Sequence, residues 1–171
     1  SDSSQDIDFK DSDDDSILND IKKNFKKKNN RKRSNKHSKK RKSSKLTSDK
    51  VCSQALQMIK FLGTLNMKKL DLKHEPRLRR IAFLEWISQL EIAFSSNKYT
   101  IKVLKDYSTK NKIHKTKSEL VDSLIYTVAY AFMDKATRSS TMIYKNKGPK
   151  LLRVLHMKCT SIDENTKLRA R

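Results

Sequence analysis

The chain has 171 residues and an uneven charge, with 40 Lys and Arg against 19 Asp and Glu and a net charge of +21. Only two glycines and two prolines leave little material for hairpin turns or phosphate-binding glycine loops, so an all-helical protein is favoured over a sheet. Two cysteines are too few for a disulfide framework or an all-cysteine zinc site, and no apolar run reaches the length of a membrane span. A surface this positive indicates a polyanionic partner, with an acidic membrane surface as the less favoured alternative to nucleic acid.

Residues 1–20 form an acidic tail that we expect to be disordered. They hold eight Asp and one Lys, a net of −7, and few large apolar side chains. A solvating tail is the simplest interpretation. Two alternatives stay open: its serines lie beside acids and suit an acid-directed kinase, and the tail can fold back electrostatically on the basic run that comes after it.

Residues 21–46 form a basic arm with almost no apolar side chains, which we also expect to be disordered. Clustered Lys and Arg suit nucleic-acid binding, and residues 31–42 suit a nuclear-import signal in an otherwise cytoplasmic protein. A solvated linker is the remaining alternative. The residues expected to contact nucleic acid are Lys26, Lys27, Lys28, Arg31, Lys32, Arg33, Lys36, Lys39, Lys40, Arg41 and Lys42.

Apolar periodicity begins near residue 47, so we assign residues 47–171 to one helical domain, with its C-terminal end cut short. A first helix is expected from an N-cap at Ser48 to a stop at Gly63. The connector over residues 65–72 is apolar but has no clear periodicity.

Residues 77–96 predict the central helix of the domain. Phe83, Leu90 and Phe94 lie on one face, and Trp86, the only tryptophan, lies on an adjoining face. Other apolar residues, Leu84 and Ile92 among them, fall outside both faces. We therefore expect neighbours to cover this helix on most of its sides.

Three further helices are expected along the chain. After a short packed segment (97–107) and a basic loop (108–115), Thr116-x-x-Glu119 forms a capping box that starts a helix of about 20 residues. A loop over 137–147 is expected to touch the core through Met142, Ile143 and Tyr144. Pro149 then starts a helix, and Ser161-x-x-Glu164 starts another at the end of the sequence.

These patterns predict a small bundle of four to five helices. The side chains expected to form its core are Phe83, Trp86, Leu90, Phe94, Leu124, Val128 and Leu155.

Catalytic and metal-binding patterns are not found in the sequence. The acids of the predicted domain are scattered, so no pair can be given acid and base roles, and we expect no enzyme, small-molecule substrate or cofactor. His156 and Cys159 are spaced to share a helix face, but two ligands are too few for a zinc site. Two basic clusters remain, at 77–80 and 110–117. Phosphate binding and a solvated basic face explain each of them equally well.

The sequence FLEWISQLEIAF, with Phe83 and Trp86 spaced as Phe-x-x-Trp on an amphipathic helix, resembles the Gag polyproteins of Copia-type retrotransposons. Residues 147–171 look like the helix pair found further along that domain, so the resemblance covers about residues 65–171. It implies an all-helical, capsid-like domain that self-associates and packages RNA. Many members end in a Cys-x-x-Cys-x4-His-x4-Cys zinc knuckle, which this sequence lacks.

We therefore expect a non-enzymatic, Gag-like structural protein that forms homo-oligomers and binds RNA, or alternatively DNA, through its basic arm. The competing hypothesis is a cellular nuclear protein that binds nucleic acid through the same arm and uses its helical bundle to dock other proteins.

Overall fold

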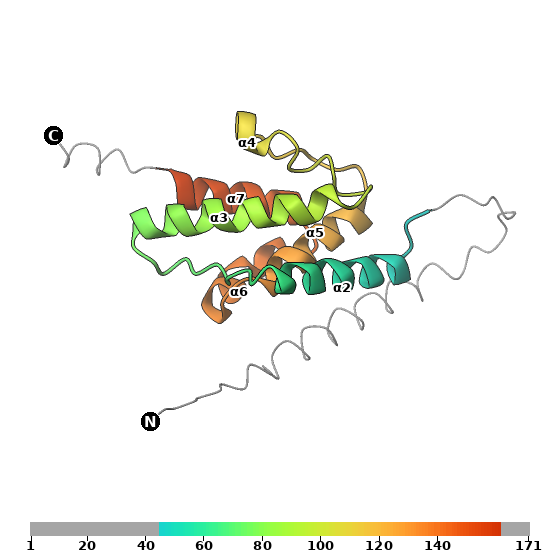
Figure 1. The fold of residues 1–171 in the computed structure, drawn as a ribbon, viewed down its shortest axis with the longest axis horizontal. Helices are drawn as coiled ribbons and strands as arrows, with labels where there is room; N and C mark the ends of the chain where they lie inside the picture. Colours follow the sequence, from blue (N-terminus) through green and yellow to red (C-terminus); the bar gives the residue numbers. More distant parts are fainter. Residues whose placement is uncertain (1–44, 162–171) are drawn as a thin grey trace, which may run out of the picture.

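The computed structural model describes residues 45–161, which fold into a small all-α bundle (Figure 1). The acidic tail, nearly all of the basic arm with its eleven predicted contact residues, and the last predicted helix lie outside the described residues. The elements within this range are α2 (Ser48–Thr64), α3 (Pro76–Ser95), α4 (Tyr107–Lys110), α5 (Glu119–Ala131), α6 (Lys135–Thr141), the 3-10 helix η1 (Met142–Tyr144) and α7 (Gly148–Thr160).

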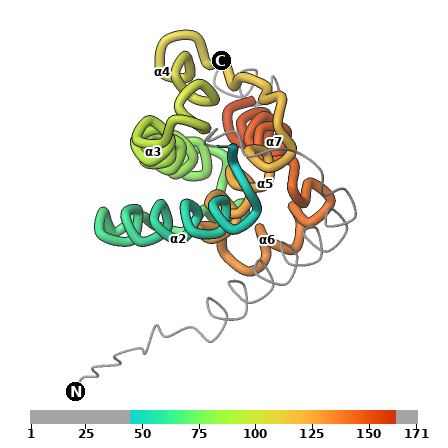
Figure 2. Tube along the Cα trace, turned by 90° about the vertical axis from the view of Figure 1, so that its right-hand side faces the viewer, coloured from blue at the N-terminus to red at the C-terminus, as the bar shows by residue number. Residues whose placement is uncertain are grey.

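The four longer helices surround one core. α5 packs against α2 and α7, and α3 packs against the same two helices. Figure 1 shows α3 and α7 side by side, and Figure 2 shows α5 among α2, α3 and α7. The seven side chains expected in the core, from Phe83 to Leu155, are all at most 3% exposed.

The surroundings of α3 differ from the sequence prediction. Its inner face is buried, but Leu84 is 38% exposed and Ile92 is 48% exposed. α2 and α7 cover only part of the helix circumference, so the prediction that neighbours cover most of its sides is wrong. α5 is the more enclosed helix, with eight of its 13 residues buried.

The helix starts are shifted from the predicted caps. The hydroxyl of Thr47, and not that of Ser48, accepts the amide of Lys50 at the start of α2 (3.3 Å). At α5 the N-cap is Ser118, which accepts from the amide of Val121 (3.4 Å). Thr116 cannot cap the helix because its hydroxyl contacts the carboxylate of Asp122 and the carbonyl of Ser118.

α5 ends at Ala131, earlier than its apolar pattern predicts, because Arg138 caps it. This side chain is only 8% exposed and donates to the carbonyl oxygens of Tyr130 (3.0 Å) and Ala131 (2.8 Å) at the C-terminal end of the helix. The carbonyl of Tyr130 also accepts from the amide of Met133 (3.2 Å). The stretch predicted as a loop after residue 136 instead contains most of α6 and all of η1.

The predicted core contacts of this stretch are only partly present. Met142 is 47% exposed and Ile143 is 76% exposed, so neither is a core residue. Tyr144 is partly buried and packs against the core.

The connector between α2 and α3 is fixed to the end of α5. The amide of Leu70 and the indole Nε1 of Trp86 both donate to the carbonyl oxygen of Phe132, each at 2.8 Å. The amide of Asp134 donates in return to the carbonyl of Leu70 (3.0 Å), which forms a parallel β-bridge between Leu70 and Met133. The carbonyl of Phe132 therefore joins three segments, which are the connector, α3 and the end of α5.

Asparagines make the tight turns for which the sequence has too few glycines. Asn66, Asn111 and Asn146 adopt left-handed backbone angles, with φ between 51° and 61°, and come after α2, α4 and η1. Gly63 was predicted to stop the first helix, but it lies inside α2, and neither glycine has a positive φ.

Between residues 45 and 161, no helix combines the length and apolar composition that crossing a bilayer requires.

Candidate nucleic-acid interface

A basic pocket lies where the loop before α5 meets the start of α7. Its volume is about 230 Å³, and its cationic lining residues are Lys115, Lys147, Lys150 and Arg153. Thr116, Asp122 and Pro149 complete the wall. Four positive side chains and one carboxylate make this a cavity suited to an anion.

The close packing of α7 on α5 brings these side chains together. Gly148 lies so near α5 that a Cβ built on it would stand 2.5 Å from the Cβ of Ile125. The left-handed turn at Asn146 directs the chain into this contact, and the amide of Lys147 donates to the carbonyl of Tyr144 (2.9 Å). α7 therefore begins against α5, beside Lys115.

The electrostatics of the basic pocket favour a negatively charged ligand. Among residues 45–161 none of its four cations forms an ion pair, and Nη1 of Arg153 is buried without a hydrogen-bond acceptor. The one carboxylate in the lining of the pocket, that of Asp122, contacts the hydroxyl of Thr116. No side chain caps the N-terminus of α7, so the helix dipole adds positive potential at its start.

Only one of the predicted phosphate-binding residues of the domain contributes to this site. From the 110–117 cluster, Lys115 lines the pocket. In the 77–80 cluster, Arg79 donates from Nη1 to the carbonyl of Leu72 (3.2 Å) and so holds the connector, while Arg77 and Arg80 are exposed.

The pocket residues that were not predicted from the sequence are Lys147, Lys150 and Arg153. Their spacing of i, i+3 and i+6 gives a basic stripe along one side of α7, and this signal can be read in the sequence. Their proximity to Lys115 cannot, because it depends on how α7 packs on α5.

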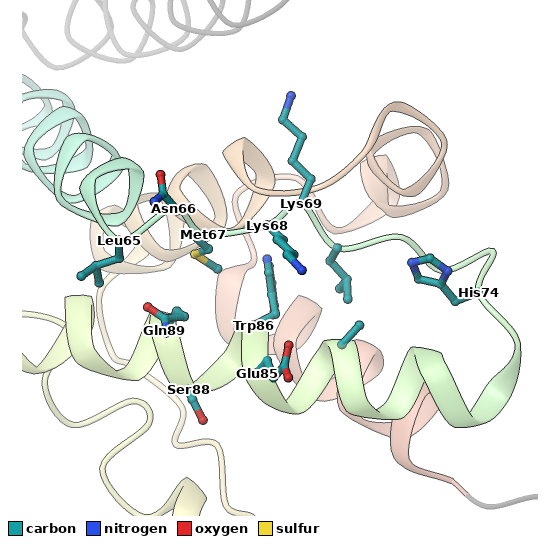
Figure 3. A pocket seen from close by; sticks show the side chains of 12 residues that line it. Leu65, Asn66, Met67, Lys68, Lys69, His74, Glu85, Trp86, Ser88 and Gln89 are labelled. Carbon is teal, nitrogen blue, oxygen red and sulfur yellow. The ribbon is translucent and has the colours of Figure 1, made fainter. Parts of the chain in front are cut away.

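A second cavity, here called the Trp86 groove, lies between the α2–α3 connector and α3 (Figure 3). It has a volume of about 390 Å³, and its apolar lining consists of Leu65, Met67, Leu70, Ala82 and Trp86. Its polar lining includes Lys68, Lys69, His74, Glu85 and Gln89. In Figure 3 the α3 side chains lie on one side of the groove and those of the connector on the other. Oε1 of Gln89 is buried without a donor among the described residues.

His156 and Cys159 share a helix face as two possible metal ligands. Both ring nitrogens of His156 instead contact hydroxyl groups of the protein. Nδ1 of His156 lies 2.8 Å from the hydroxyl of Tyr107, and Nε2 lies 3.3 Å from the hydroxyl of Thr160. Burial lowers the pKa of His156 and raises the pKa of Cys159 to about 11. Within residues 45–161, no three potential ligands gather to hold a metal ion.

One short hydrogen bond holds the segment between α3 and α5. Nε2 of His114 lies 2.5 Å from a carboxylate oxygen of Asp106, and this hydrogen bond lowers the pKa of Asp106. The amide of His114 also donates to the carbonyl of Val103 (2.9 Å), so the contact fixes the loop that leads to Lys115.

Comparison with models of protein families, with curated proteins and with solved structures finds no match to this chain.

Proposed function

We propose that this protein is a non-enzymatic, Gag-type structural protein that binds RNA and self-associates, with DNA as the alternative nucleic acid. The observation that carries the proposal is the basic pocket, in which four cations without ion pairs to residues 45–161 surround a space open to a phosphate group. Phosphate oxygens accept hydrogen bonds from Lys and Arg, and a buried guanidinium nitrogen gains the acceptor that it lacks.

The basic arm supports the same function from the sequence. Residues 22–45 carry 14 Lys and Arg, which suit the sugar–phosphate backbone of an extended strand. Contacts to phosphate carry no base information, so the proposed binding has little sequence preference. If about 6–10 of these residues contact single-stranded RNA, log K falls against log salt with a slope of roughly −4 to −7. Residues 31–42 would also serve nuclear import of an otherwise cytoplasmic protein.

Self-association is supported by an apolar surface, here called the α3 outer face. It consists of Leu78, Ile81, Leu84 and Ile92, which are between 38% and 51% exposed. A helix face of this kind suits a second copy of the chain. The net charge of +21 keeps copies apart until a polyanion neutralises it, so the proposal couples assembly to RNA.

The test compares single-stranded RNA binding by the full chain and by the double variant Lys147→Gln/Lys150→Gln over a series of salt concentrations. The variant should bind more weakly at every salt, and its slope should be shallower by about 0.7 for each phosphate that it no longer neutralises. Lys60→Gln/Lys102→Gln removes the same charge from exposed positions that do not line the pocket, and it serves as the matched control. Equal reductions of affinity in both double variants would refute a specific role of the basic pocket.

The alternative function is that of a cellular nuclear protein that binds nucleic acid and docks other proteins. The Trp86 groove favours it, because a cavity beside a helix with both apolar and polar lining suits a peptide. RNA-dependent assembly separates the two, since a docking module has no reason to assemble when its charge is neutralised.

A further inference from the structure

The Trp86 groove has the chemistry of a site for an apolar segment that carries negative charge. Its lining is mixed, with apolar side chains beside Lys68, Lys69 and Glu85. Residues 65–80, of which only some line the groove, hold six Lys and Arg against two acids. Leu65 at its edge is 40% exposed, so an occupant would remove apolar surface from water. The orphaned Oε1 of Gln89 also offers an acceptor to a polar group of the occupant.

The same chain contains a segment with the matching pattern. Residues 11–25, DSDDDSILNDIKKNF, hold five Asp, and their large apolar residues are Ile17, Leu18, Ile21 and Phe25. Ile17, Ile21 and Phe25 are spaced at intervals of four, so on a helix they would share one face. We propose that this segment binds the Trp86 groove of its own molecule, with its apolar face on the groove and its Asp residues towards the basic connector.

The intervening chain is long enough for this contact. Residues 26–44 separate the segment from the described part of the chain, and 19 residues span up to about 60 Å when extended. α2 has 17 residues, a length of about 25 Å, so the segment can reach the groove at the far end of that helix. Tethering also gives the segment an effective concentration in the millimolar range, so even weak complementarity populates the contact.

Charge favours this intramolecular occupant over a second copy of the folded part. Residues 45–161 carry 23 basic and 9 acidic residues, so two such surfaces repel each other. The acidic segment meets the opposite charge at the groove and adds an attraction that salt weakens. The inference depends on the groove and on the segment sequence, and it holds whether or not the protein binds RNA.

The test measures amide exchange of the full chain over residues 65–74, the part of the connector that lines the groove. Ile17→Ser/Ile21→Ser should reduce the ratio of docked to undocked molecules by about tenfold or more. It should therefore increase amide exchange over residues 65–74. Because this variant changes only residues outside the range 45–161, it does not remove core contacts of residues 45–161.

Leu65→Ser should have the same effect from the groove side, whereas Ile143→Ser serves as the control because Ile143 is 76% exposed and does not line the groove. A matching rise in amide exchange over residues 65–74 in both the segment and the groove variants, independent of protein concentration, would support the proposal. Unchanged exchange in the segment variant would overturn it. A response that appears only at high protein concentration would also overturn it, since it would identify a second copy as the occupant.

Discussion

α3 and α5 both carry apolar residues on more than one face, yet the chain covers them to different extents. α5 buries eight of its 13 residues, seven of them consecutive from Ser123 to Ala129. α3 buries six of its 20 residues and leaves the α3 outer face more than a third exposed. A helix with apolar residues on several faces therefore does not reveal from its sequence whether those faces are covered by the same chain or by a partner.

The difference comes from the path of the chain after each helix. α5 lies against α2 and α7, and the chain then returns through α6 and η1, where Sδ of Met142 accepts from the hydroxyl of Tyr126 (3.9 Å). Arg138 closes the end of α5 by capping its last carbonyl groups. No described element returns over the α3 outer face, so its apolar side chains are free to meet a partner.

The largest expected effect concerns the buried side of α3. Trp86→Ala should lower the free energy of unfolding by roughly 3–5 kcal/mol, because it removes a large aromatic side chain and its bond to Phe132. A denaturant melt of the full chain measures this loss. Leu84→Ala, on the exposed side of the same helix, should cost much less. A loss below about 1 kcal/mol for Trp86→Ala would show that this side of α3 is not a core face.

The next effect concerns the contact between α5 and α7. Gly148→Ala places a Cβ against Ile125 and the backbone of Tyr126, so it should destabilise the protein by about 1–3 kcal/mol. Gly63→Ala is the matched control, since a Cβ there meets nothing within 4 Å, and it should stabilise α2 by about 0.5–1 kcal/mol. Thermal melts of both variants measure the contrast. Equal effects would contradict the close approach of α7 to α5.

A smaller effect is expected from pH, at the junction of α3 and α7. Burial lowers the pKa of His156 below its ordinary value of 6.5, and the ring packs edge-on to Phe83 of α3. The unfolded chain therefore takes up the proton first. The stabilising contribution is complete above pH 6.5 and is lost as pH falls towards the lower folded pKa.

Urea melts between about pH 5 and 8 test this sign by comparing the native chain with His156→Gln. The difference in the free energy of unfolding between the two should shrink as the solution is acidified. The native protein could instead gain stability relative to His156→Gln as the pH falls over this range. That result would contradict a lowered pKa of His156 in the folded protein.

The smallest effect on stability is expected at the α3 outer face. Ile81→Ser/Ile92→Ser should change the free energy of unfolding by no more than about 0.5 kcal/mol per site, since both side chains are nearly half exposed. It should nevertheless reduce self-association, which analytical ultracentrifugation measures. A large loss of stability would show that this face is covered, whereas unchanged association would remove it as the contact between copies.

The fold class and the inner core side chains could be predicted from the sequence because periodicity records which face of a helix avoids water. Trp86 and Leu155 are buried as that periodicity requires. The caps were less certain, since Thr116, Ser118 and Thr47 lie among several hydroxyl groups near each helix start, and only the folded chain decides which of them caps. The glycine and proline count likewise gave no indication of the asparagine turns.

The candidate sites could be predicted only in part, because each of them joins distant segments. The basic pocket brings Lys115 next to Arg153 through the packing of α7 on α5, and the Trp86 groove depends on the Leu70–Met133 bridge. Periodicity and local motifs do not reveal that Lys115 lies near Arg153 or that Leu70 pairs with Met133. Arg79 also looked like part of a binding cluster, but it holds the carbonyl of Leu72.

The most direct test of the proposed function is light scattering by the full chain at moderate salt, with and without single-stranded RNA. The protein alone should stay small, because its net charge of +21 opposes contact between copies. Added RNA should neutralise that charge and produce larger particles, and Ile81→Ser/Ile92→Ser should reduce their formation. Particles that contain a single copy of the protein, whether or not RNA is present, would contradict the Gag-type function and favour the nuclear docking protein.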